Sequence, residues 1–239
     1  MIPVTDAVRA QRLPIVNVAI ILACVAVFVY ELTLSLPGLN RFFFDYSVIP
    51  ASLDAWANHP SGLRMPSTIF TSAFLHGGWL HLGGNMTYLW VFGDNVEDAL
   101  GHLLYALFYA ISAVGAITLQ VAVDKHSEVP VLGASGAIAG VLAGYLVLYP
   151  RAPVGVFVPL IWFLGLIPIP AVILILFWFG LQLFSGIASI GASSAGEGVA
   201  VWAHVGGFIT GLAMMIAARP FIPRRSLSQP RSRRQTRVR

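Results

Sequence analysis

The stretch GASGAIAGVLAGYLVLY occupies residues 133–149 and is apolar except for a serine near its start. Gly136, Gly140 and Gly144 recur every four residues and form one small-residue face, which is typical of close helix packing in membranes. A polar side chain inside a membrane-length helix costs free energy and usually faces other helices, so Ser135 is a functional candidate. Taken alone, helix packing explains this serine at least as well, because short Gly-Ser patterns are common.

A second apolar run carries a histidine near its start. His204 stands three residues before Gly207, and Gly211 follows one turn later, so this helix also has a small-residue face. Two glycine-faced helices can touch closely. We expect that contact to bring His204 within hydrogen-bond reach of Ser135, where it could act as a general base.

A third run carries His81 and Asn85 near its start, spaced so that they share one helix face. Both side chains can donate hydrogen bonds to a developing oxyanion. Together with His204, the pair His76 and His81 could instead ligate a metal. Neither a cysteine cluster nor an HExxH pattern supports that alternative, so we expect no metal and no cofactor.

Composition places the chain in a membrane. Of its 239 residues, 57% are hydrophobic and 10% are charged, and the mean hydropathy is +0.81. A water-soluble globular domain of this length does not normally have such a composition. The single cysteine, Cys24, cannot form an intrachain disulfide and lies inside the first apolar run.

The apolar runs predict an all-α polytopic membrane protein, a bundle of six transmembrane helices within residues 15–217. A span needs about 20 mainly apolar residues. Residues 1–14 are expected to be a cytoplasmic N-terminal segment, and residues 218–239 a basic, disordered cytoplasmic tail. The required span length, applied to the apolar runs, places the helices near residues 15–35, 80–98, 102–123, 133–149, 170–190 and 199–217.

The charge distribution predicts the topology. Eight of the fourteen lysines and arginines occur at or after Arg219. Anionic lipid on the cytoplasmic side explains such a tail better than nucleic acid does. Both basic ends can lie in the cytoplasm only if the number of spans is even, so we interpret residues 152–169 as a connection along the cytoplasmic side of the membrane. The second, fourth and sixth helices then descend from the outer face, which places His81, Asn85, Ser135 and His204 within about 10 Å of one depth.

Two connecting segments complete the expected organisation. Residues 37–79 are rich in aromatic side chains and are interrupted by Pro50, Pro60 and Pro66, which favours short helices at the membrane interface. Residues 189–198 are rich in Gly and Ser and are expected to form a mobile loop over the outer mouth, a plausible lid or gate. Its Gly-x-Ser pattern at Ser193 is not taken as a catalytic motif.

Three motifs, in the order in which they occur along the chain, resemble those of the rhomboid family of intramembrane serine proteases. The resemblance covers roughly residues 15–217. Two positions depart from common family patterns: Ser67-Thr68 stands where many members have Trp-Arg, and Ala139 where some have a tyrosine that stacks on the catalytic histidine. The matching residues are His76, His81-Leu82-Gly83-Gly84-Asn85, Gly133-Ala134-Ser135-Gly136, Ala203-His204-Val205-Gly206-Gly207 and Gly211.

The resemblance implies a serine endopeptidase with a Ser–His dyad. Ser135 is the expected nucleophile and His204 the base, and the Ser135 amide, His81 and Asn85 form the expected oxyanion hole. The implied substrates are single-span membrane proteins cut in or near the extracytoplasmic part of their helix. The expected location is a bacterial plasma membrane with both termini in the cytoplasm, and the sequence indicates no oligomeric state.

Two other classes remain open from the sequence. A non-catalytic relative that binds or escorts membrane clients would share the fold, although such proteins lose the serine or the histidine. A transporter would line a conduit with the polar residues, but the chain lacks an internal repeat. The grouping of polar residues near one face favours a water-filled cavity open on that side, as hydrolysis requires.

Overall fold

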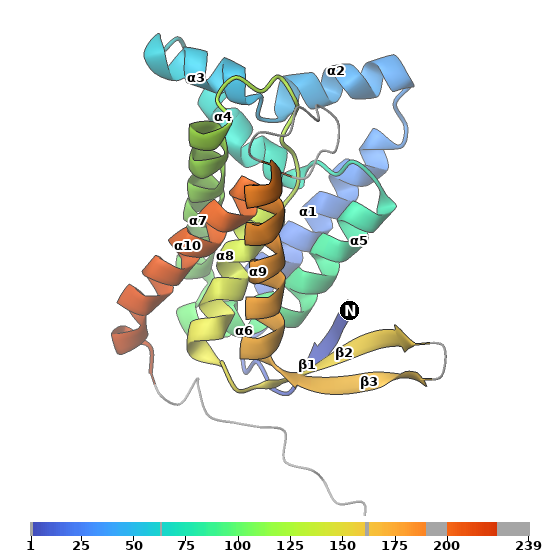
Figure 1. Ribbon diagram of the computed structural model, residues 1–239, viewed down its shortest axis with the longest axis vertical. Helices are drawn as coiled ribbons and strands as arrows, with labels where there is room; N and C mark the ends of the chain where they lie inside the picture. The colour runs from blue at the N-terminus through green and yellow to red at the C-terminus, as the bar shows by residue number, and fades with distance from the viewer. Residues whose placement is uncertain (1, 63, 161–162, 190–199, 224–239) are drawn as a thin grey trace, which may run out of the picture.

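The computed structural model describes residues 2–62, 64–160, 163–189 and 200–223. Figure 1 shows a helix bundle with short helices across one end and a small sheet at the other. The elements in chain order are β1 (Ile2–Asp6), α1 (Ile15–Glu31), α2 (Leu36–Tyr46), α3 (Pro50–Asn58), α4 (Arg64–Thr71), η1 (Ser72–Phe74), α5 (Trp79–Tyr88), η2 (Leu89–Gly93), α6 (Asp94–Leu100), α7 (His102–Val123), α8 (Ser135–Leu148), β2 (Pro153–Leu160), β3 (Phe163–Pro170), α9 (Ala171–Ser189), α10 (Val201–Ala218) and η3 (Arg219–Phe221).

Each of the six apolar runs is helical, as predicted. The run expected over 80–98 is continuous from α5 through the π-helical segment η2 into α6, because Leu89 and Asp94 keep helical backbone angles. By length and composition, three helices of the described chain can cross a membrane: α7, α9 and α10 with η3. Helices α1 and α8 are shorter and apolar, so the count of six spans stays a prediction.

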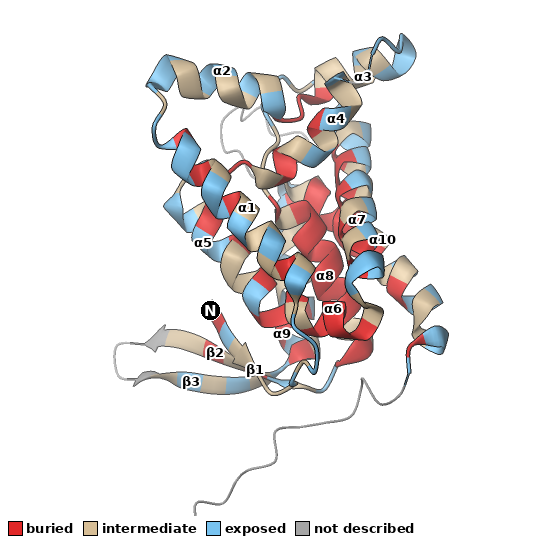
Figure 2. Cartoon of the chain, turned by 180° about the vertical axis from the view of Figure 1, so that it is seen from behind, coloured by how far each residue is buried: buried red, intermediate tan, exposed pale blue. Residues whose placement is uncertain are grey.

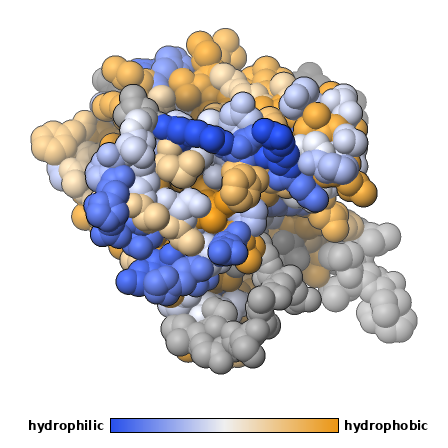
Figure 3. All heavy atoms as spheres, turned by 90° about the horizontal axis from the view of Figure 1, so that it is seen from above, coloured by the Kyte–Doolittle hydropathy of each residue, from blue (hydrophilic) through white to orange (hydrophobic). Residues whose placement is uncertain are grey.

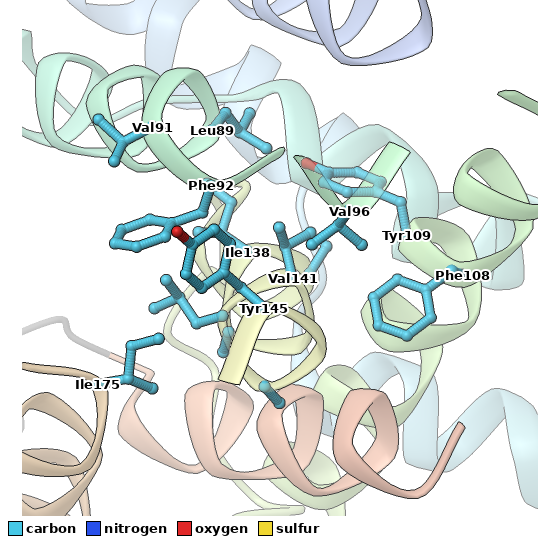
Figure 4. Packing of buried hydrophobic residues seen from close by; sticks show 14 of the residues in the cluster. Leu89, Val91, Phe92, Val96, Phe108, Tyr109, Ile138, Val141, Tyr145 and Ile175 are labelled. Atoms are coloured by element: carbon cyan, nitrogen blue, oxygen red, sulfur yellow. The ribbon is translucent and has the colours of Figure 1, made fainter. Parts of the chain in front are cut away.

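Helix α8 occupies the centre of the bundle. Figure 2 shows its buried residues surrounded by the other helices, and from Gly136 to Tyr145 every residue is buried. Figure 4 shows part of this packing, in which Tyr145 lies against Phe92 with ring centroids 4.9 Å apart. A helix that is apolar on all sides is expected to be surrounded by protein in this way.

The predicted contact between glycine-faced helices is present. A Cβ atom on Gly140 would lie 3.1 Å from the carbonyl oxygen of Gly207 on α10, and one on Gly136 would lie 2.7 Å from Cβ of Ala116 on α7. Contacts this tight leave no room for a side chain. The small residues therefore allow α7, α8 and α10 to pack backbone against backbone.

Buried polar groups fix α1 against the helix formed by α5, η2 and α6. The carbonyl of Leu89, the first residue of the π-helical segment, accepts a hydrogen bond from Asn17 Nδ2 at 2.9 Å. The Glu97 carboxylate accepts from the backbone amides of Val16 and Asn17 at 3.0 and 2.7 Å. These amides open α1 and have no partner within their own helix, so Glu97 caps α1 from α6. Glu97 therefore has a structural role in joining α6 to α1.

The sheet corrects the all-α prediction. Residues 152–169, expected to be a connection along the cytoplasmic side of the membrane, form the antiparallel hairpin of β2 and β3, with Pro153 opposite Pro170. The N-terminal segment adds β1, antiparallel to β2, with Ile2 opposite Phe157. The hairpin is apolar at almost every position, so it lacks the alternation that signals a strand.

The end of β1 is anchored to the bundle. Asp6 Oδ2 accepts hydrogen bonds from the Tyr145 hydroxyl at 2.6 Å and from Asn95 Nδ2 at 2.9 Å. Tyr145 lies on α8 and Asn95 on α6. The first strand is therefore tied to the two helices that it passes.

The short helices α2, α3 and α4 cross the end of the bundle where α5, α8 and α10 begin (Figure 1). Seen from above in Figure 3, this end shows hydrophilic side chains over much of the face and hydrophobic ones toward its edge. The helices expected within 37–79 are thus present, and their place at a membrane interface stays a prediction. The expected loop over 189–198 and the basic tail lie almost entirely outside the described residues.

Candidate active site

A cavity of about 770 Å³ opens where α5, α8 and α10 begin, and it contains all four residues singled out in the sequence. Ser135, His204, His81 and Asn85 line it together with Trp178 of α9. The three helices start at the same end of the bundle (Figure 1), so the expected grouping of these residues at one end is observed, and their depth in a membrane stays a prediction.

Ser135 and His204 are in direct contact. Ser135 Oγ lies 2.7 Å from His204 Nε2, which is hydrogen-bond distance. Ser135 is the first residue of α8 and is half-buried, whereas His204 on α10 is 8% exposed. A serine hydroxyl bonded to an imidazole nitrogen beside an open cavity is the arrangement that activates a nucleophile.

Hydrogen-bond donors surround the start of α8. Gly133 has φ of +117°, and a Cβ there would lie 2.5 Å from His81 Nε2 and 3.7 Å from Asn85 Nδ2. Glycine thus allows both the backbone angle and the close approach of the His81 ring. Asn85 is 7% exposed, and its Nδ2 has no acceptor among the described residues. An unpaired donor at the wall of this cavity, beside Gly133, could donate to a substrate oxygen.

His76 lies in the loop before α5 and supports this group from behind. Its ring packs edge-on against His81 with centroids 5.2 Å apart, and its Nδ1 lies 3.1 Å from the carbonyl oxygen of Phe74. Burial, with His81 nearby, lowers the pKa of His76 to about 4. The neutral ring is therefore the form present near pH 7.

The sequence analysis missed two residues of α9 that contact His204. Gln182 Oε1 lies 2.8 Å from His204 Nδ1, and the Trp178 ring lies 5.7 Å from the His204 ring, centroid to centroid. The sequence analysis expected a dyad of Ser135 and His204 and named no residue that holds the histidine. An isolated glutamine in the apolar run 171–188, at the depth of the other polar residues, was the available signal.

A glutamine on α7 was missed as well. Gln120 Oε1 accepts a hydrogen bond at 3.1 Å from the backbone amide of Ala203, the residue before His204. That amide lies in the first turn of α10 and also donates to the carbonyl oxygen of Ala200 at 3.0 Å, so its hydrogen bond is shared between the two acceptors. Gln120 therefore holds the start of α10 against α7.

In the described part of the chain, no group of three or more His, Cys, Asp or Glu side chains is placed to hold a metal ion. His76 and His81 lie together, but His204 makes its contacts to Ser135 and Gln182. The residues that the sequence offered as an alternative metal site are thus engaged differently.

A sequence model of the rhomboid domain matches residues 64–221, about two thirds of the chain. The chain belongs to the rhomboid family. Its match begins at α4 and ends with η3, so it includes every residue of the cavity that the sequence singled out.

Several named proteins are similar to this rhomboid. Rhomboid protein 1, mitochondrial, of Saccharomyces cerevisiae is 37% identical over 95 residues, 38% of this chain and 28% of that protein. Rhomboid-like protein 11, chloroplastic, of Arabidopsis thaliana is 38% identical over 73 residues, 30% and 26% of the two chains. The human presenilin-associated rhomboid-like protein, mitochondrial, is 28% identical over 132 residues, 53% and 32% of the two chains.

The match therefore covers about a quarter to a third of the length of these relatives. Their names place them in mitochondria or chloroplasts, which differs from the bacterial plasma membrane expected from the sequence. The family and the apolar helices agree on a membrane protein, and the compartment stays a prediction.

Proposed function

We propose that this rhomboid is an intramembrane serine endopeptidase that cleaves single-span membrane proteins in or near the extracytoplasmic part of their transmembrane helix. The observation that carries the proposal is the 2.7 Å contact between Ser135 Oγ and His204 Nε2 at the wall of an open cavity. In this proposal six helices span the bilayer and both termini lie in the cytoplasm. The arginine tail contacts anionic lipid, and nucleic acid is not a partner.

The first half of the reaction acylates the serine. His204 Nε2 accepts the hydroxyl proton of Ser135 while Oγ attacks the carbonyl carbon of the scissile peptide. The carbonyl oxygen becomes an oxyanion, which accepts hydrogen bonds from the Ser135 amide, His81 and Asn85 Nδ2. His204 then gives its proton to the leaving amine as the peptide bond breaks.

The second half returns the enzyme to its starting state. A water molecule from the cavity loses a proton to His204 and attacks the acyl carbon. The new carboxyl product leaves, and Ser135 recovers its proton from His204. Placing this chemistry where the cavity opens gives water access to groups that are otherwise surrounded by apolar helices.

The test is cleavage of a single-span substrate by the purified protein in detergent. We expect wild type to cleave, Ser135→Ala to be inactive, and Ser185→Ala, an exposed serine of α9, to keep full activity. A serine-directed phosphonate should label wild type and Ser185→Ala, and it should not label Ser135→Ala or His204→Ala. A protein that escorts membrane clients or forms a conduit would show neither Ser135-dependent cleavage nor labelling.

A further inference from the structure

His204 makes a polar contact through each of its two ring nitrogens. Nε2 lies 2.7 Å from Ser135 Oγ, and Nδ1 lies 2.8 Å from Gln182 Oε1. A neutral imidazole has one N–H and one bare nitrogen, and an amide oxygen can only accept. With the Gln182 amide oxygen facing Nδ1, the proton belongs on Nδ1, which leaves Nε2 bare to accept the proton of Ser135.

We propose that Gln182 is a positioning residue that fixes the tautomer and the orientation of His204, so that Ser135, His204 and Gln182 work as a triad. This inference rests on the proposed peptidase function. It adds a third residue to the expected Ser–His dyad. The role is the one that a carboxylate plays in Ser-His-Asp enzymes and an amide plays in Cys-His-Asn enzymes.

Helix α9 supplies a second contact to the same ring. Trp178 stands four residues before Gln182 and therefore shares its helix face. Its ring lies 5.7 Å from that of His204 at an interplanar angle of 44°. Ala139, which stands where some rhomboids have a tyrosine, is fully buried and too small to support the histidine. The indole limits tilting of the imidazole, and the amide sets its rotation.

The local surroundings make the hydrogen bond to Gln182 effective. His204 is 8% exposed, so water seldom competes for Nδ1. Among the described residues, its ring nitrogens contact Ser135 and Gln182, and both side chains are uncharged. A neutral amide directs the proton to Nδ1 without holding a permanent charge beside the base.

Three variants test the role through kinetics. Gln182→Leu removes the acceptor at nearly constant volume, and we expect kcat to fall roughly tenfold with KM unchanged, as the loss of one hydrogen bond in the transition state predicts. Gln182→Glu restores an acceptor and should recover most of kcat. It should also move the acid limb of the pH–rate profile to higher pH, because a carboxylate stabilises the imidazolium. Leu181→Ala, a neighbouring residue that is 49% exposed, should leave kcat and the profile unchanged.

A structural role alone would not move that pH limb. If Gln182→Leu kept wild-type kcat, or if Gln182→Glu lost as much activity as Gln182→Leu at an unchanged thermal midpoint, the proposed role would be wrong. The thermal midpoints of all three variants separate a misfolded protein from a misplaced base.

A second measurement does not depend on catalysis. In the ¹⁵N spectrum of histidine-labelled protein in detergent, with His204→Ala to assign the signal, we expect His204 to carry its proton on Nδ1. Gln182→Leu should shift it toward a mixture of tautomers. A proton on Nε2 in wild type would overturn the inference. If the wild-type protein showed no cleavage that depends on Ser135, the peptidase proposal would be refuted. This spectrum would still decide the tautomer of His204.

Discussion

Gly207→Ala should force apart α8 and α10, the two helices that carry Ser135 and His204. Gly207 lies three residues after His204, and its partner Gly136 directly follows Ser135. A Cβ on Gly207 would lie 2.8 Å from the carbonyl carbon of Gly136 and closer still to its oxygen. Ordinary Cβ contacts begin at 3.4 Å, and both clashing atoms are backbone, so neither can rotate away. The helices must separate by about 1 Å locally, because a packed core does not absorb the extra volume.

That displacement has a calculable effect on the site. Ser135 Oγ lies 2.7 Å from His204 Nε2, and a separation of about 1 Å more would make this distance longer than a hydrogen bond. A misplacement of that size costs on the order of 100-fold in rate. Alanine favours the helix by about 0.5–1 kcal/mol over glycine, whereas overpacking costs about 1–3 kcal/mol. The net change should lower the thermal midpoint by a few degrees, at about 2–4 °C per kcal/mol.

The assay is kcat/KM for a single-span substrate in detergent, measured with the thermal midpoint. Gly180→Ala on α9 is the matched control, because a Cβ there meets nothing within 4 Å. We expect the control to behave like wild type. If Gly207→Ala kept kcat/KM within about twofold of wild type at an unchanged midpoint, the close backbone contact would not be what positions the dyad.

Three further variants test other parts of the structure. Glu97→Ala removes the acceptor that caps α1 and should lower the free energy of unfolding by about 3 kcal/mol, measured by thermal unfolding in detergent. Tyr145→Phe removes the 2.6 Å donor to Asp6, which should cost about 1.5–3 kcal/mol and speed proteolysis of the N-terminal segment. Asn85→Ala should lower kcat by about 100-fold or more at an unchanged thermal midpoint, since its Nδ2 has no partner among the described residues.

Local sequence predicted the helices and the residues of the site. Long apolar runs can satisfy their backbone groups only as helices in a membrane, so helix positions followed from composition. The polar residues at the starts of three runs were visible because polar groups are costly there. The glycine spacing even indicated which helices touch, and the structure brings Ser135 and His204 to hydrogen-bond distance.

Contacts between distant segments were beyond the sequence. Strand β1 pairs with a segment about 150 residues away, and the apolar hairpin gave no alternating signal. Glu97 caps α1 across 81 residues of chain, and Gln182 reaches His204 across 22. The identity of a residue shows which hydrogen bonds its side chain can donate or accept. Its partner depends on how the helices are rotated about their axes. Residue chemistry thus determined which groups lie within the apolar helices, and tertiary packing decided which of them meet.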